Sequence, residues 1–220
     1  FTKVIALNPQ SANAYFNRGI VYKQQKKWQL AEADFTKVIA LNPQLANAYY
    51  NRGVVYQQQK KWQLAEADFT KVIALNPQFA EAYLIRGAVY HAQNKYALAL
   101  ADYNQALNLT KDARLLAVIN NAIAFTKYNQ GQIEVAIKQW QESIKLDNKL
   151  AEPHLALAVA LYSQGEQEKA YQLAQKALQL DKSFADVKVL KDNLWGENLI
   201  ADAQKLLSTP RVKNLLSQMR

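Results

Sequence analysis

Apolar side chains recur every three or four residues along this chain, in runs of about a dozen residues separated by short polar breaks. One such run contains Ala46, Tyr49, Gly53 and Tyr56, and a second run follows a break near residue 60. A spacing of three to four residues places these side chains on one face of a helix. The pattern therefore predicts pairs of short helices joined by tight turns.

The helix pairs repeat with a period of 34 residues. The dipeptide Asn-Pro stands at residues 8–9, 42–43 and 76–77, and the two segments between these points are nearly the same string. An internal duplication explains this identity, and a fixed period of this length indicates a repeat architecture. Pro43 and Pro77 are expected to end the second helix of each pair, because proline lacks an amide donor and restricts the residue before it.

The residue types inside one period resemble the tetratricopeptide repeat (TPR) family. We number repeat positions from the first residue of the first helix, so that Ala12 is position 1. The family's aromatic, small and proline positions are 4, 8, 11, 20, 24 and 32, which in the first repeat hold Tyr15, Gly19, Tyr22, Ala31, Phe35 and Pro43. Small residues suit positions 8 and 20, because two helices cross closely there.

The resemblance implies an all-α fold, a right-handed TPR superhelix (α-solenoid) of antiparallel helix pairs with a C-terminal capping helix region. The later repeats match less closely, and the interval from Ala99 to Ala136 is 37 residues, three more than one period. The expected segments are a half repeat at 1–11, repeats at 12–45, 46–79, 80–113, 114–150 and 151–184, and capping helices at 185–220.

The irregular segments give more detailed expectations. The added residues predict that the first helix of the fourth repeat starts early, near Thr110 or Lys111. The closing segment predicts helices over 185–195, 198–207 and 210–219, the last of them capped by Thr209 with Pro210 in its first turn. Residues 1–10 repeat Phe35–Gln44, so we expect the second helix of a truncated repeat and a natural protein that extends further upstream.

In TPR proteins the first helix of each repeat lines a concave face, with positions 2, 5, 6, 9, 12 and 13 exposed. The resemblance thus implies a partner-binding surface that includes Asn13, Phe16, Asn17, Asn47, Tyr50, Asn51, Leu84, His91, Asn121, Phe125 and Tyr128. Asn17 and Asn51 share position 6, which resembles the asparagine ladder of peptide-binding TPR proteins, or they are inherited copies of one solvated residue. The family's clamp for a peptide carboxylate is not expected, because only Asn51 fits it.

Arginine occupies position 7 in three successive repeats, as Arg18, Arg52 and Arg86. These residues form either a basic row or ion pairs with a carboxylate of a neighbouring helix, such as Asp34 or Asp68. We favour the ion pairs.

Composition narrows the chemistry. The chain of 220 residues has no cysteine and two histidines, so we expect no metal site, no cofactor and no catalytic residue. The net charge of +9 indicates either a solvated surface, which we favour, or a preference for an acidic partner, and no recognition motif for nucleic acid accompanies it. We expect neither a membrane span nor a signal peptide, which makes the cytoplasm the default location.

The resulting functional hypothesis is a non-catalytic scaffold that binds a peptide or protein in a concave groove. The alternative is a substrate-recruiting TPR region of a larger enzyme, such as a glycosyltransferase, whose catalytic domain lies outside this chain. The duplicated repeats and the segment 191–207 are similar to those of bacterial, and especially cyanobacterial, TPR proteins. We also expect weak end-on self-association through the open apolar face of the half repeat.

Overall fold

The computed structural model describes residues 1–219, and every regular element over those residues is a helix, so the predicted all-α class is confirmed. The chain divides into two compact units, one spanning Phe1–Leu109 and the other beginning at Thr110. The boundary lies within the irregular 37-residue interval from Ala99 to Ala136. Each unit is described by itself.

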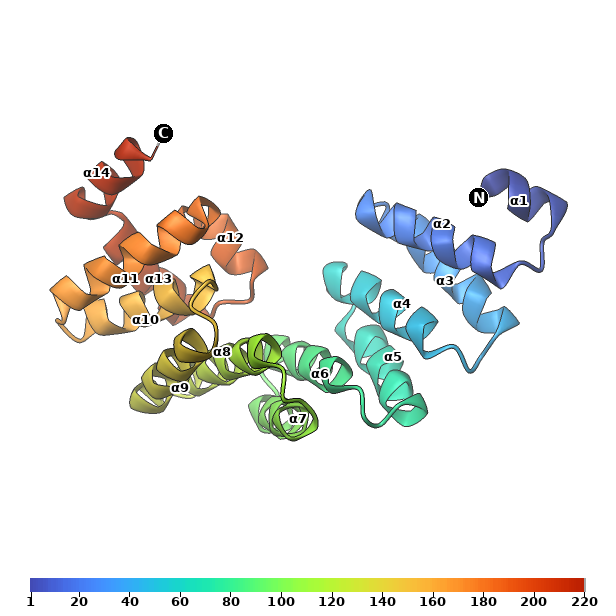
Figure 1. Cartoon of the computed structure of the whole chain (residues 1–220), viewed down its shortest axis with the longest axis horizontal. Coiled ribbons are helices and arrows are strands. Elements are labelled where there is room, and N and C mark those ends of the chain that lie inside the picture. The colour runs from blue at the N-terminus through green and yellow to red at the C-terminus, as the bar shows by residue number, and fades with distance from the viewer. Residues whose placement is uncertain (220) are drawn as a thin grey trace. The chain divides into compact units, whose positions relative to one another are not determined.

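The first unit is a half repeat followed by three helix pairs (Figure 1). Its helices are α1 (Thr2–Leu7), α2 (Ala12–Gln24), α3 (Trp28–Leu41), α4 (Ala46–Gln58), α5 (Trp62–Leu75), α6 (Ala80–Ala92) and α7 (Tyr96–Leu109). Each odd-numbered helix from α3 packs against the helix before it, and α3 and α5 also pack against the helix that follows. We call the first helix of a pair helix A and the second helix B.

Glycine at position 8 lets helix A approach helix B closely. A Cβ atom on Gly53 would lie 3.0 Å from the ring of Phe69, and one on Gly87 would lie 2.5 Å from the ring of Tyr103. The steric reason predicted for a small residue at this position is therefore correct. Both rings are almost wholly buried and form the centre of their helix pairs.

A charged network also joins the helices of the first unit. Arg52 donates to both oxygens of Asp68 on α5 at 2.8 Å, and it donates to the hydroxyl of Thr36 on α3 at 3.1 Å. The guanidinium lies between the rings of Tyr49 and Tyr56, and it connects three helices from two repeats.

The same network recurs in the repeats on either side of Arg52. The acid and hydroxyl partners are Asp34 and Thr2 for Arg18, and Asp102 and Thr70 for Arg86. The favoured ion pairs thus form, and each side chain of the alternative basic row is already paired with a carboxylate.

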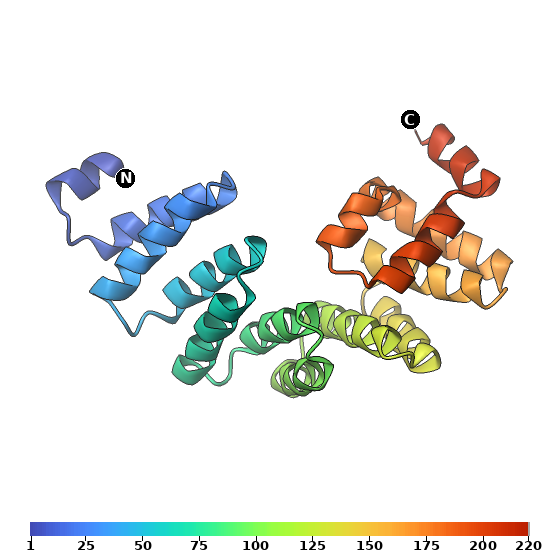
Figure 2. The same cartoon turned by 180° about the vertical axis from the view of Figure 1, so that it is seen from behind.

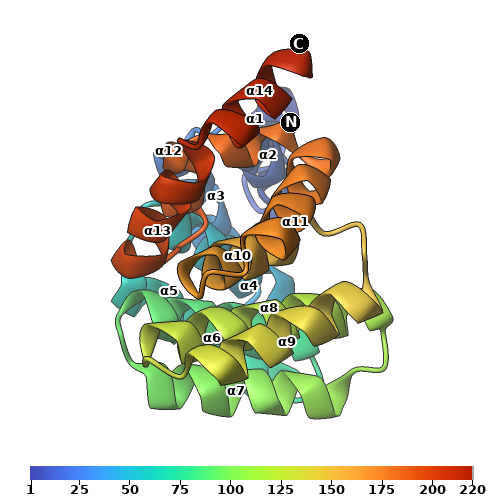
Figure 3. The same cartoon turned by 90° about the vertical axis from the view of Figure 1, so that its left-hand side faces the viewer.

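The second unit contains two further helix pairs and a C-terminal segment (Figure 3). Its helices are α8 (Ala113–Asn129), α9 (Ile133–Leu146), α10 (Ala151–Ser163), α11 (Gln167–Leu180), a short 3-10 helix η1 (Lys182–Ala185), α12 (Val187–Asp192), α13 (Glu197–Leu207) and α14 (Pro210–Gln218). Helix α8 is 17 residues long, whereas α2 has 13. It begins at Ala113 rather than near Thr110, because the side chain of Asp112 caps it by accepting from the amide of Leu115 at 2.7 Å.

The C-terminal segment is broken more often than the sequence predicted. Asp186 caps α12 by accepting from the amide of Lys188, and Leu194 has a left-handed backbone with φ of 62°, so the expected helix over 185–195 is limited to Val187–Asp192. Helix α14 begins at Pro210 with Thr209 as its cap, as predicted. Helix α13 packs on α10, and α14 packs on α11 (Figure 2).

The turn between helices A and B has one backbone conformation in all five repeats. Position 15 has φ between 57° and 87° in each case. Glycine favours this left-handed conformation, whereas other residues pay for it with steric strain. The residues at position 15 are Lys26, Lys60, Asn94, Gly131 and Gly165.

Candidate protein-binding surface

The candidate surface of the first unit consists of the positions on its three A helices that were predicted to line the concave face, and we call it the A face. The face is formed by positions 2, 5, 6, 9 and 12 of α2, α4 and α6. Its apolar members are neither fully buried nor fully exposed, and they are Phe16, Ile20, Tyr50, Val54, Leu84, Ile85 and Ala88. The packing behind them shows how firmly they are held.

Two aromatic side chains of the A face rest on the core of the unit. Phe16 makes an edge contact with Phe35, with ring centroids 5.8 Å apart, and Tyr50 makes the same contact with Phe69 at 5.9 Å. Tyr50 also contacts Phe79 at 5.5 Å, and its partial burial raises the pKa of its hydroxyl. Both rings are therefore held in place with one side accessible, an arrangement that suits anchoring contacts.

The asparagines of the A face differ in whether their side chains are exposed to solvent or hydrogen-bonded within the unit. Asn13, Asn17 and Asn47 have exposed side chains. Asn51 is only 8% exposed, accepts from Lys23 Nζ at 2.6 Å and donates to the carbonyl of Asn47 at 2.8 Å. Its amide is therefore engaged within the unit, and Asn17 is the exposed member of the predicted ladder.

Lys23 is the charged side chain beside this pair. Its ammonium group crosses from α2 to reach Asn51 on α4, and burial lowers its pKa. Asn51 supplies a neutral oxygen, so this hydrogen bond offsets only part of the lost hydration. An anionic group from a ligand would stabilise the ammonium further.

The remaining predicted residues of the first unit lie on α6. Leu84 is half-buried on the A face, at position 5. His91 is 7% exposed, and its ring lies 5.5 Å from the ring of Tyr96 on α7. Its position in the helix pair assigns it to packing within the unit.

In the second unit the corresponding positions are covered by the chain itself. Phe125 contacts Trp140 at 5.5 Å and Trp195 at 5.2 Å, while Tyr128 donates to Asp202 at 3.3 Å. Burial, with a smaller contribution from Asp202, raises the pKa of Tyr128 to about 12. Trp195 and Asp202 belong to the C-terminal segment, so this segment lies on the A helices of the second unit.

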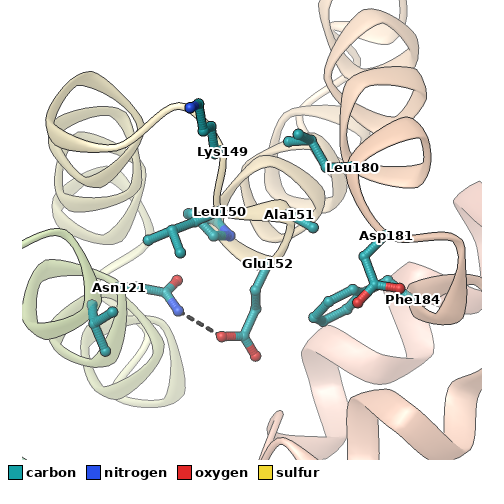
Figure 4. A pocket seen from close by; sticks show the side chains of 10 residues that line it. Asn121, Lys149, Leu150, Ala151, Glu152, Leu180, Asp181 and Phe184 are labelled. Carbon is teal, nitrogen blue, oxygen red and sulfur yellow. Dashed lines mark hydrogen bonds between the residues drawn. The ribbon is translucent and has the colours of Figure 1, made fainter. Parts of the chain in front are cut away.

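The carboxylate of Glu152, a half-buried residue, connects the same segment to two A helices. Glu152 on α10 accepts from the amide of Asn121 on α8 at 2.7 Å and from the indole of Trp195 at 2.9 Å. Burial raises the pKa of Glu152, and the two hydrogen bonds oppose that effect. Figure 4 shows Asn121 and Glu152 facing one another across the space between α8 and α10.

A pocket of about 310 Å³ opens beside this pair. Lys149, Asp181 and Phe184 contribute to its wall from the turn before α10 and from the region of η1 (Figure 4). The carboxylates of Glu152 and Asp181 and the ammonium group of Lys149 line this small cavity. Most of the other lining side chains are apolar, so the cavity lacks a set of polar groups that converge on one point. The cavity is a gap left where the C-terminal segment crosses the helix pair.

The turn before α13 is fitted tightly to α8. A Cβ atom on Gly196 would clash with the side chain of Asn129, which would have to move to admit any larger residue. The predicted partner-binding residues Asn121, Phe125 and Tyr128 are thus buried, Phe125 and Tyr128 by the protein's own C-terminal segment and Asn121 where it donates to Glu152. The expectation of exposure at these positions failed because it was based on repeat position alone.

Trp195 was absent from the predicted surface, and Lys23 and Glu152 lay on it without being chosen as partner-binding residues. Lys23 and Glu152 occupy positions 12 and 2, which the resemblance already marked as exposed, so their position was a usable signal. Trp195 lies outside the repeats, and its contact with Phe125 spans 70 residues of sequence. No periodicity encodes that contact.

Residues 1–219 contain neither a candidate metal site nor a candidate membrane span. In that part of the chain no group of three His, Cys, Asp or Glu side chains is placed to hold a metal ion. The helices found there are too short or too polar to cross a membrane.

Comparison with known families agrees with this geometry. The tetratricopeptide repeat family matches residues 12–45, 46–79 and 80–112, and the related TPR repeat family matches residues 126–165. Together the matches cover more than half of the chain. The chain belongs to the tetratricopeptide repeat family. No curated protein sequence matches it.

Several solved structures share the fold of this TPR protein. YrrB, described as a TPR protein with an unusual peptide-binding site, is 22% identical with a TM-score of 0.61, covering 94% of this chain and 98% of its own. PilF of Pseudomonas aeruginosa is 18% identical with a TM-score of 0.67, covering 94% and 97%. MamA of Desulfovibrio magneticus is 20% identical with a TM-score of 0.66, covering 78% and 96%. At these identities the similarity concerns the fold alone.

Proposed function

We propose that this TPR protein is a non-catalytic scaffold that binds a protein or peptide on the A face of its first unit. The observation that carries the proposal is the row of partly exposed apolar side chains on successive A helices, with Phe16, Tyr50 and Leu84 at position 5 of the three repeats. Rigid aromatic anchors surrounded by polar groups are typical of the centre of a protein interface.

The polar groups around the row support the same function. Asn13, Asn17 and Asn47 are exposed, and each amide can both donate and accept a hydrogen bond. Lys23 adds a partly buried positive charge, which favours an acidic partner. The description of YrrB as having a peptide-binding site is consistent with this use of the fold.

Site-specific photo-crosslinking in an extract of the source cells tests the location of the surface. A benzoylphenylalanine in place of Asn17 should crosslink a partner, and the adduct should be lost when Tyr50→Ala removes the neighbouring anchor. The matched control places the crosslinker at Ala40, an exposed residue of α3. Adducts that form only from the crosslinker at residue Ala40 would contradict the proposal. So would adducts from residue 17 that survive in the double variant Phe16→Ala with Tyr50→Ala.

A further inference from the structure

We propose that the partner of the A face is an amphipathic helix that crosses α2 and α4 and carries an acidic residue opposite Lys23. This proposal rests on the proposed function and specifies the class of partner. It is drawn from the second unit, where the same repeat positions already hold a helix of this protein.

The occupant seen in the second unit is α13. It buries Leu199, Ile200, Ala203, Leu206 and Leu207, and it exposes Ala201, Gln204 and Lys205 between them. This spacing of three and four residues makes one apolar face on a helix of three turns. The A helices of the TPR fold in this chain therefore accept an amphipathic helix, rather than an extended strand.

Repeat positions relate the two units residue by residue. Trp195, at the start of the docked segment, contacts Phe125 at position 9 and donates to Glu152 at position 2 of the next repeat. In the first pair of repeats these positions hold Ile20, a half-buried apolar side chain, and Asn47, an exposed amide that can accept from an indole.

Position 12 supplies the charge. In the second unit it is Tyr128, which donates to the carboxylate of Asp202 on α13. In the first repeat it is Lys23, whose ammonium group is partly buried beside Asn51. A carboxylate placed as Asp202 is placed would meet a cation there instead of a hydroxyl, and the resulting hydrogen bond would be charge-assisted.

The two contacts define the ligand. An aromatic residue must face Ile20 and Asn47 just before the helix begins, and an acidic residue must follow seven positions later, within the helix. Residues 193–207 of this chain meet both conditions, with Trp195 and Asp202. A helix of this pattern, from a partner protein, fits the A face.

A peptide of residues 193–207 carrying a fluorescent label is the probe, and fluorescence anisotropy with the full chain is the measurement. Replacing Asp202 of the peptide by lysine should weaken binding by about tenfold, the scale of one lost ionic contact. Lys23→Glu in the chain should weaken binding of the original peptide and restore binding of the Asp202→Lys peptide. Docking on the second unit cannot give this rescue, because Tyr128 stands at that position there.

Lys27→Glu is the matched control, since Lys27 is exposed in the turn after α2 and carries the same charge. The proposal is overturned if Lys27→Glu has the same effect as Lys23→Glu, or if charge exchange gives no rescue. It is also overturned if an Ala203→Pro peptide, which cannot form the helix, binds equally well. In those cases crosslinking from the residue that replaces Asn17 still tests the proposed function independently.

Discussion

At positions 7 and 23 the first unit pairs an arginine with an aspartate, whereas the fifth repeat places Leu157 and Leu173 at the same two positions. Both solutions join helix A to helix B. The ionic one requires a hydrogen-bonded network that also reaches the preceding repeat, and the apolar one requires only matching shapes. The comparison shows that one backbone tolerates either an ion pair or an apolar contact between these two positions.

The units differ in a second respect, which concerns function. The A face of the first unit is open, whereas in the second unit α13 covers the equivalent side chains. Positions 5 and 9 of the fifth repeat, Leu155 and Val159, are wholly buried. Their counterparts in the second repeat, Tyr50 and Val54, keep part of their surface in solvent. The second unit thus shows a filled form of the surface that the first unit leaves open.

The strongest test of the first difference removes one side of the ionic pair. Arg52→Ala leaves Asp68 buried without its partner, which should lower the free energy of unfolding by about 3–5 kcal/mol. The double variant Arg52→Leu with Asp68→Leu copies the fifth repeat and should recover most of that loss. Urea unfolding followed by circular dichroism measures both.

Arg114→Ala is the control, because Arg114 is exposed at the start of α8. It should change stability by less than about 0.5 kcal/mol. Equal destabilisation in the single and double variants would show that the two chemistries are not interchangeable.

Trp195→Ala tests the second difference. It removes the contact with Phe125 and the indole donor to Glu152, and loss of such a large buried ring costs about 3–5 kcal/mol. Amide hydrogen exchange should quicken in α8, α10 and α13, while α2 to α5 stay protected. Leu64→Ala, at an exposed site on α5, serves as the control. Unchanged protection of α8 and α10 would mean that α13 contributes little to the second unit.

The pH dependence of the second unit should depend on Glu152. Burial raises its pKa in the folded state, so its ionised form is more costly there than in the unfolded chain. Its contribution to stability is therefore greatest below its unfolded pKa of about 4.3 and is lost as pH rises through the higher folded value. Glu152→Gln should gain stability relative to the wild type as pH rises. Its oxygen can still accept from the indole of Trp195, and its amide nitrogen can donate to the side-chain oxygen of Asn121 once that amide turns round.

Thermal unfolding of both proteins between pH 4 and 8 measures this difference. His154, whose pKa burial lowers, is present in both proteins and cancels from the comparison. Glu142→Gln, at an exposed position of α9, should show no such trend. Parallel curves for the wild type and Glu152→Gln would contradict the assignment.

The smallest expected effect concerns position 15 of the repeats. Lys26 and Lys60 adopt the left-handed conformation that Gly131 and Gly165 adopt in the second unit. Lys60→Gly relieves steric strain but makes the unfolded chain more flexible, so the net gain should be about 0.5–1 kcal/mol. Lys61→Gly, at the next residue with a negative φ, should instead destabilise. Both follow from thermal denaturation.

Much of the fold could be predicted from the sequence, because the repeat period, the glycines at position 8 and the aromatic residues at position 24 are all local signals. The surface was harder. Exposure at Asn17 and Tyr50 followed from repeat position, but burial of Phe125 and Tyr128 depends on a segment more than 65 residues away. The apolar residues at Leu155 and Val159 were a signal that this part of the surface is covered. The hydrogen bond between Lys23 and Asn51 could not be predicted, because it depends on the distance between α2 and α4.

The arginine network has a consequence for how such a protein can change its length. Each arginine takes its acid from its own repeat and its hydroxyl from the repeat before, so every 34-residue copy carries what its successor needs. Recombination between two nearly identical copies could add or delete one of them and leave each remaining arginine satisfied. The duplicated segment is therefore a unit that a gene can gain or lose without disturbing the packing of its neighbours.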